Sequence, residues 1–151
     1  MKLKVILGSD HAGFRLKEAI KSFLKKAGYA VEDVGANSYD AEDDYPDFVY
    51  NAASKVAKDK QSKGIVFGGS GQGEAMTANK VNGIRAALYY GKNMEIVELS
   101  RTHNDANVLS LGARFLTEKE AIKSVKIWLN TPFNNKERHM RRIKKISMIE
   151  K

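Results

Sequence analysis

The stretch IVFGGSGQGE at residues 65–74 places a short apolar run directly before a glycine-rich loop that ends in a carboxylate. The run Ile65-Val66-Phe67 is typical of a buried strand of a parallel sheet. The residues from Glu74 to Lys80 are compatible with a helix. We therefore expect the loop between the carboxyl end of a strand and the N-terminus of a helix, where open α/β sheets bind their ligands.

The loop itself predicts a binding site for an anion. It consists of Gly68, Gly69, Ser70, Gly71, Gln72 and Gly73. Consecutive glycines allow backbone N–H groups to turn toward a ligand at a distance that a Cβ atom would block. The alternative is a glycine-rich turn that only lets the strand and the helix pack closely. The loop taken alone leaves both interpretations open.

Two common nucleotide-binding motifs are excluded by the residue after the loop. A P-loop needs a lysine followed by Ser or Thr directly after its last glycine, and here Glu74 follows Gly73. The dinucleotide pattern G-x-G-x-x-G also fails, because Glu74 stands three places after Gly71. The predicted ligand is therefore an anion that tolerates a neighbouring carboxylate.

Strand and helix patterns alternate from one end of the chain to the other. We expect strands at residues 3–7, 29–34, 64–67, 84–88 and 108–111. Apolar stripes at helical spacing fill the gaps, and the last of them follows a capping-box sequence from Thr117 to Glu120. The pattern predicts one domain over residues 1–151, a three-layer αβα Rossmann-like sandwich with a five-stranded parallel sheet.

Composition narrows the class of protein further. The 151 residues are 42% hydrophobic, and no apolar run approaches the roughly 18 residues of a membrane span. A first strand begins almost at once, with no basic and apolar leader before it, so we expect a cytoplasmic protein without a membrane partner. The absence of cysteine excludes disulfides, thiolate catalysis and cysteine-based metal sites.

The excess of positive charge is concentrated at the C-terminus. Residues 136–151 hold seven Lys or Arg and two Glu, which supplies +5 of the formal net charge of +8. We expect a basic helix from about residue 134. Arg138 and Arg142 lie one helical turn apart, a spacing suited to holding one phosphate, although a solvated basic face is the usual role of such residues. Apolar residues interrupt the charges and no aromatic residues accompany them, which argues against nucleic-acid binding.

Two further polar clusters carry titratable side chains. Asp10 and His11 follow the first strand, so they are expected at the same edge of the sheet as Glu74 and across a shared cleft from it. A turn with a satisfied histidine is the alternative. His103 lies in a polar run at the end of a predicted helix, where a histidine often serves as a cap. His11, His103 and His139 are scattered without metal-binding spacing, so no metal site is predicted.

Several separate motifs together resemble one known family. They are GSDHAGF at 8–14, DYP at 44–46, GSGQG at 69–73, ANK at 78–80, GIRA at 83–86, HNDANVL at 103–109, and Arg138-His139 followed by Arg142. In this order they resemble the ribose-5-phosphate isomerases of the B type, whose family also holds the galactose-6-phosphate isomerase subunits. The resemblance covers essentially the whole chain.

The resemblance implies an aldose-ketose isomerase of the pentose phosphate pathway, which interconverts ribose 5-phosphate and ribulose 5-phosphate through an enediolate without metal or redox cofactor. It implies that Glu74 moves the proton between C2 and C1, that His103 protonates the ring oxygen and that Asp10 assists ring opening. The remaining implied contacts are backbone N–H groups of Gly69 to Gly73 with Ser70 for the oxyanion, His11, Arg138 and Arg142 for the phosphate, and Asn104 and Arg114 for sugar hydroxyls or site assembly. It also implies a homodimer, or a dimer of dimers, with shared sites.

One departure concerns the base. Many members of the family carry a catalytic cysteine where this chain has Gly68, so the chain resembles the branch in which a glutamate after the loop is the base. A helix N-terminus favours the anion of Glu74 and an enclosed pocket opposes it, so the direction of its pKa shift stays open. A second difference is the segment 89–93, which looks slightly longer than its counterpart in that branch.

Two other functions remain possible on the sequence alone. The first is a hexose-phosphate isomerase of the same family, acting on allose or galactose 6-phosphate, because one more carbon changes only the depth of a pocket. The second is a non-catalytic module that binds a sugar phosphate or RNA through the basic C-terminus.

Overall fold

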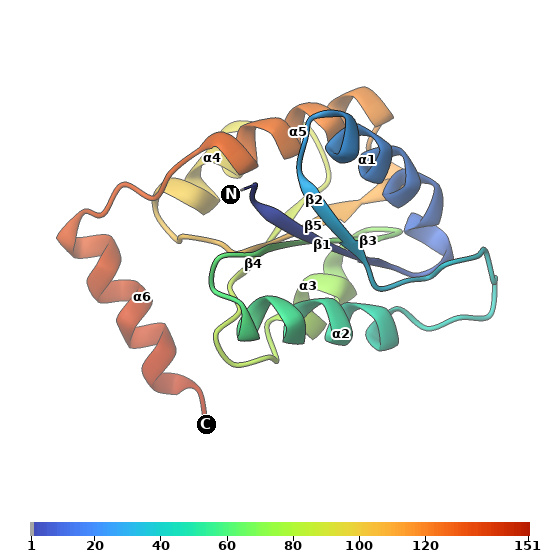
Figure 1. Ribbon diagram of the computed structural model, residues 1–151. Helices are drawn as coiled ribbons and strands as arrows, with labels where there is room; N and C mark the ends of the chain where they lie inside the picture. The colour runs from blue at the N-terminus through green and yellow to red at the C-terminus, as the bar shows by residue number, and fades with distance from the viewer. Residues whose placement is uncertain (1) are drawn as a thin grey trace.

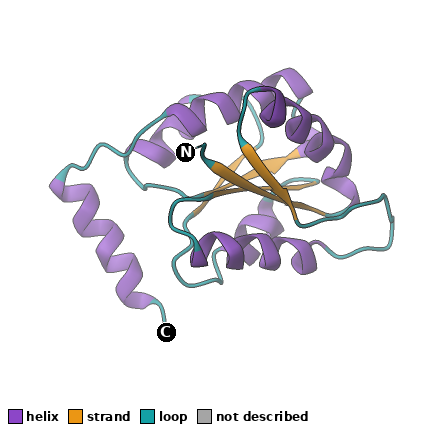
Figure 2. Ribbon diagram, viewed as in Figure 1, coloured by secondary structure: helices purple, strands orange, loops and turns teal. Residues whose placement is uncertain are grey.

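A computed structural model describes residues 2–151 as a single parallel sheet covered by helices on both faces (Figures 1 and 2). The five strands are Lys4–Ser9 (β1), Ala30–Asp33 (β2), Lys63–Gly68 (β3), Ala86–Tyr89 (β4) and Val108–Gly112 (β5). They lie in the order β2-β1-β3-β5-β4. The strand order reverses direction between β1 and β3, the place where doubly wound sheets bind ligands. The predicted fold is confirmed.

The helices form the two outer layers of the sandwich. One face of the sheet is covered by α1 (Phe14–Lys26), α4 (Glu95–Thr102) and α5 (Glu118–Asn130), and the other by α2 (Tyr45–Lys58) and α3 (Gln72–Ala78) (Figure 1). Each face has its own apolar core, because successive strand residues point to opposite sides. Leu7 and Trp128 belong to the first core, and Ile6 and Val49 to the second.

The C-terminal helix α6 (Glu137–Ile149) lies apart from the sandwich and is joined to it by residues 131–136 (Figure 1). His139 is the only buried residue of this helix. Hydrogen bonds fasten both flanks of α6 to the body. On the N-terminal side, the backbone N–H of Asn134 donates to Thr102 O at 3.2 Å. On the C-terminal side, the backbone N–H of Gly83 donates to Glu150 Oε1 at 2.8 Å, and Asn82 Nδ2 donates to Lys151 O at 2.6 Å. A helix with a basic surface and a single buried residue is not held by an apolar core.

Element bounds differ from the sequence prediction by a few residues. The helix after the glycine loop begins at Gln72, two residues early, because Gly71 has a φ of +80° and takes the N-cap position. The strand expected from Ile84 begins at Ala86, since the N–H of Arg85 donates to the side chain of Asn107 instead of to the sheet. The basic helix begins at Glu137 instead of about 134.

Two other expectations from the sequence can be compared with the structure. The capping box at Thr117 and Glu120 is present, with hydrogen bonds of 2.8 and 3.1 Å. Across residues 2–151, none of the helices has the length and apolar character needed to cross a bilayer.

Candidate active site

The loops after β1 and β3 meet at the carboxyl edge of the sheet. β1 and β3 are neighbours, with Ser9 opposite Phe67, so Asp10 and the glycine loop follow at the same level. They enclose a cavity of about 360 Å³. Its walls are Asp10, His11, Ala12, Tyr45, Gly69, Ser70, Gly73, Glu74 and Arg114. The predicted cleft between Asp10, His11 and Glu74 is therefore present within one chain.

Glu74 projects from the first turn of α3 and is only 4% exposed. Burial is the largest influence on its carboxyl group and raises its pKa. Backbone hydrogen bonds at Glu74 and Gly71 act in the opposite direction, while the nearby Asp10 adds to the rise. Of the two effects that the sequence left open, burial prevails over the helix start. The result is a carboxylate that holds a proton more tightly than an ordinary glutamate.

Gly68 explains how a glutamate can occupy this place. A Cβ atom on residue 68 would overlap the carboxyl group of Glu74, which folds back over the end of β3. The side chain of Glu74 thus fills the space that a side chain at position 68 would take. A side chain at position 68 and this conformation of Glu74 therefore exclude one another.

Two other glycines of the loop make room for side chains of the cavity wall. A Cβ atom on Gly73 would overlap the ring of Tyr45, and one on Gly69 would lie 3.0 Å from the guanidinium of Arg114. The backbone N–H of Arg114 also donates to Gly69 O at 3.0 Å. The loop therefore serves close packing as well as presenting its backbone to the cavity, so its two interpretations are compatible.

Asp10 and His11 are each held by two hydrogen bonds. Asp10 is 5% exposed, and its Oδ1 accepts the backbone N–H groups of Ala12 at 3.0 Å and Gly13 at 3.3 Å. The backbone N–H of His11 donates to Asp43 Oδ1 at 2.9 Å, and its Nδ1 lies 2.7 Å from the same oxygen. The hydrogen bond to Asp43 is the main cause that raises the pKa of His11, against the opposing effects of burial and Arg114.

Sequence reasoning missed two residues of this region, Tyr45 and Asp43. Tyr45 belongs to one of the motifs quoted above, so a signal for it existed, but no role was attached to it. Asp43 gave no signal, because its hydrogen bonds join residues 32 positions apart. The ligating atoms of Asp10, His11 and Asp43 lie within 4.8 Å of one another, and the hydrogen bonds just described account for that proximity without a metal ion.

The other predicted residues lie at the opposite edge of the sheet. α4 starts after the carboxyl end of β4 and ends just before the amino end of β5, so His103, its C-cap residue, is carried away from Glu74. Its ring stacks on that of His139, with centroids 4.1 Å apart and an interplanar angle of 16°. Arg138 and Arg142 are on α6, and their charges act on His139. None of His103, Asn104, Arg138 and Arg142 lines the cavity that holds Glu74.

The stacked histidines include one buried ring nitrogen that has no hydrogen-bond partner in the described part of the chain. His139 is 4% exposed, and its Nε2 has no hydrogen-bond partner within residues 2–151. Burial, followed by the charge of His103, lowers the pKa of His139, and the nearby arginines and Lys136 act in the same direction. A buried polar atom without a hydrogen-bond partner is energetically unfavourable.

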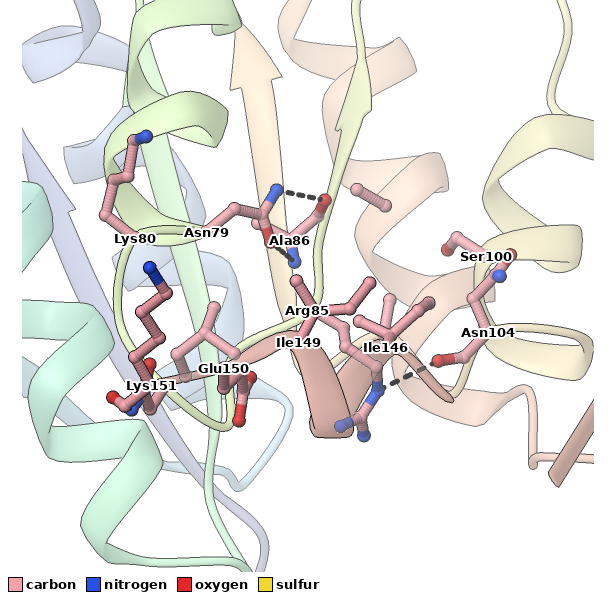
Figure 3. A pocket seen from close by; sticks show the side chains of 14 residues that line it. Asn79, Lys80, Arg85, Ala86, Ser100, Asn104, Ile146, Ile149, Glu150 and Lys151 are labelled. Atoms are coloured by element: carbon pink, nitrogen blue, oxygen red, sulfur yellow. Dashed lines mark hydrogen bonds between the residues drawn. The ribbon is translucent and has the colours of Figure 1, made fainter. Parts of the chain in front are cut away.

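A second, larger cavity of about 730 Å³ lies beside this group, between the start of β4 and the C-terminal end of α6 (Figure 3). Ile146 and Ile149 contribute apolar surface to it, and Asn104 lies on its wall. Arg85 fixes the loop that carries Asn104, since its Nε donates to Asn104 O at 3.0 Å (Figure 3). Arg101 supports the same loop from inside by donating to Asp105 Oδ1 at 2.8 Å.

Comparison with known proteins identifies relatives along nearly the whole chain. The family model described as ribose/galactose isomerase matches residues 5–146. The ribose-5-phosphate isomerase B of Mycolicibacterium paratuberculosis is 47% identical over 141 residues, which cover 93% of this chain and 87% of that protein. A probable ribose-5-phosphate isomerase B of Mycoplasma genitalium is 43% identical over 152 residues, covering 100% of this chain and 98% of the relative.

Solved structures agree with this result. The crystal structure of ribose-5-phosphate isomerase B from Mycoplasma genitalium with bound ribulose-5-phosphate gives a TM-score of 0.94 at 43% identity, over 99% of this chain and 97% of that one. The enzyme from Clostridium thermocellum gives 0.91 at 43% identity, over 98% and 97% of the two chains. Together with the arrangement of the site, these matches show that the chain belongs to the ribose/galactose isomerase family.

Proposed function

We propose that this protein is an aldose-ketose isomerase that interconverts ribose 5-phosphate and ribulose 5-phosphate, a step of the pentose phosphate pathway. The observation that carries the proposal is the buried Glu74 at the mouth of the glycine loop, in a chain whose relatives are ribose-5-phosphate isomerases. A relative with 43% identity binds ribulose 5-phosphate in its crystal structure. Family membership and site chemistry therefore lead to the same reaction.

The central step is a proton transfer between neighbouring carbons. Glu74 takes the proton from C2 of the open-chain aldose and returns it to C1, and the same carboxyl group works in reverse for the ketose. Burial raises its pKa, which makes the ionised form a stronger base than an exposed glutamate. Backbone N–H groups of residues 69–73 and the hydroxyl of Ser70 hold the oxygen of the enediolate, where a single donor is commonly worth about 10²- to 10³-fold in rate.

The remaining steps need residues that one chain keeps apart. His103 is assigned to protonation of the ring oxygen, with Asp10 assisting, and Arg138 and Arg142 are assigned with His11 to the phosphate. In a single chain these residues lie at two edges of the sheet, and the cavity around Glu74 contains only Asp10 and His11 of this set. A homodimer in which one chain brings His103, Asn104 and α6 to the Glu74 cavity of its partner completes the site.

The surface of α6 supports such a dimer. Its exposed apolar side chains are Met140, Ile146, Met148 and Ile149, with exposed fractions from 45% to 77%. Apolar residues on a helix that packs little against its own chain are costly to leave in water, and a second copy would cover them. The same residues interrupt the basic surface and argue against a nucleic-acid site.

A coupled assay that follows ribulose 5-phosphate formation from ribose 5-phosphate tests the proposal. We expect turnover that is lost in Glu74→Gln and is far lower with allose 6-phosphate or galactose 6-phosphate. Preference for either hexose phosphate would assign the chain to the other branch of the family's chemistry. Binding of sugar phosphates without turnover of any of them would refute the enzyme assignment.

A further inference from the structure

We propose that Asp43 is a positioning residue for the isomerase site: its carboxylate holds the His11 ring by Nδ1–H and leaves Nε2–H as the donor to the substrate phosphate. The inference rests on the proposed function for the identity of the ligand. The orientation of His11 follows from the structure alone and can be tested without any substrate.

Two contacts to one carboxylate oxygen of Asp43 hold His11 in place. Asp43 lies in the loop before α2, and a single oxygen of it receives both the backbone N–H and the ring Nδ1 of His11, at 2.9 and 2.7 Å. Because a carboxylate only accepts hydrogen bonds, we assign a proton to Nδ1 in this contact. Two contacts to one atom fix both the position of the residue and the rotation of its ring. The side chain of Asp43 is only 9% exposed, so water competes little with these contacts.

The second carboxylate oxygen of Asp43, Oδ2, also favours a positive charge on His11. Oδ2 is buried and has no hydrogen-bond partner within residues 2–151. An ionised carboxylate in this position is costly unless a cation lies against it, and His11 is its partner in the structure. The pair therefore favours the imidazolium form of His11, in which both ring nitrogens carry protons.

The other charged and polar groups around His11 act on its ring in opposite directions. Asp10, from the end of β1, favours the imidazolium, while Arg114 opposes it. Tyr39 lies edge-on to the ring at 6.1 Å and is polar only at its hydroxyl. Arg15 borders the adjoining cavity together with His11, Tyr39 and Arg114. The hydrogen bond that His11 donates to Asp43 outweighs the opposing charge of Arg114 in its effect on the pKa of His11.

The consequence is a prepared site for a dianion. Nδ1 of His11 is hydrogen-bonded to Asp43, so Nε2 is the ring nitrogen that remains for a ligand. His11 and Arg114 both line the Glu74 cavity and also the adjoining cavity of about 600 Å³, which contains Arg15 as well. Hydrogen bonds from cationic donors to phosphate are about twice as strong as neutral ones. Asp43 thus acts on the substrate through the charge and orientation of His11, without contacting the substrate itself.

The experiment compares Asp43→Asn with wild type and with Glu42→Gln. Asparagine keeps the shape and an accepting oxygen but removes the charge, and Glu42→Gln removes the same charge from an exposed neighbouring side chain. By NMR of the histidine rings, we expect the pKa of His11 to fall toward the ordinary 6.5 in Asp43→Asn only. We expect KM for ribose 5-phosphate near pH 7.5 to rise about 10-fold with kcat within about 2-fold.

Three outcomes would overturn the inference: an unchanged pKa of His11, a fall in kcat with KM unaffected, or equal effects of Glu42→Gln. The wild-type protein gives a second measurement that does not depend on how the variant folds. At a pH above the pKa of His11, ¹⁵N shifts should show the neutral ring with its proton on Nδ1, and a proton on Nε2 would contradict the proposal. If the wild-type protein showed no isomerase activity, the NMR results would still test the orientation of His11. The missing activity would count against the proposed function instead.

Discussion

The two edges of the sheet carry the two halves of the predicted site, and they differ in how complete they are. At the carboxyl edge, Glu74 and Asp10 are buried and enclosed in a cavity of the chain's own making. At the amino edge, His103 follows the end of α4, whereas the predicted arginines lie on α6, which projects from the body. His139 of α6 has a buried nitrogen without a partner among the described residues. One chain contains all the predicted residues of the site, but its Glu74 cavity gathers only some of them.

The difference follows from topology. Loops after parallel strands meet at one edge, and the switch point between β1 and β3 brings Asp10 and Glu74 together by short connections. A helix that follows a strand must run back to the other edge, so a residue at its end, such as His103, is placed far from the strand ends. In the homodimer that we propose, a second copy brings this second group to the first.

The largest effect is expected at the base. Glu74→Gln keeps the shape and hydrogen bonding of the side chain but removes its basicity, so turnover should fall by at least about 10²-fold while substrate still binds. Steady-state kinetics, together with loss of C2 deuterium to solvent in the wild type, provide the measurement. Near wild-type turnover in the variant would remove Glu74 from the mechanism.

A somewhat smaller loss is expected from Gly68→Ala. The added Cβ overlaps the carboxyl group of Glu74 and displaces the base from the end of β3, so we expect turnover to fall by about 10-fold or more. The control is the double variant with Glu74→Gln, in which the added methyl should cost little further activity because its target is already inactive. Full additivity of the two changes would show that Gly68 acts independently of Glu74.

The smallest expected effect is on stability and depends on pH. The folded-state pKa of Glu74 is raised, so its contribution to stability is fully present below its unfolded pKa and is lost as the pH rises through the folded-state value. Glutamine does not titrate. The melting temperature of Glu74→Gln should therefore exceed that of the wild type by a few degrees at neutral pH, and the gap should narrow below about pH 4.3. A gap that widens on acidification would mean that the pKa is lowered.

The amount of this account that could be predicted from sequence depends on the range of the interactions. The strand and loop at 65–74 and the capping box at Thr117 are local patterns, and the structure confirms them. The direction of the Glu74 pKa shift was open, because a helix start and burial oppose each other and burial is set by the tertiary fold. The pairing of Asp43 with His11 was missed, because no periodicity relates residues so far apart in the chain.

The separation of His103 from Glu74 was also beyond local reasoning, although the resemblance implied shared sites. Motifs in sequence order say which residues belong together, and the fold decides whether one chain can assemble them. In this protein the length and direction of α4 place His103 away from Glu74 within one chain.

The most direct test of the shared site is activity in a hybrid dimer. Glu74→Gln and His103→Ala chains carrying different tags are co-expressed, and the hybrids are purified through both tags. If each site takes Glu74 from one chain and His103 from the other, the hybrid contains one intact site and one doubly altered site, and it should recover about half of the wild-type activity per dimer. If both residues act from the same chain, each site of the hybrid lacks one group. A hybrid no more active than its two parent variants would contradict the account.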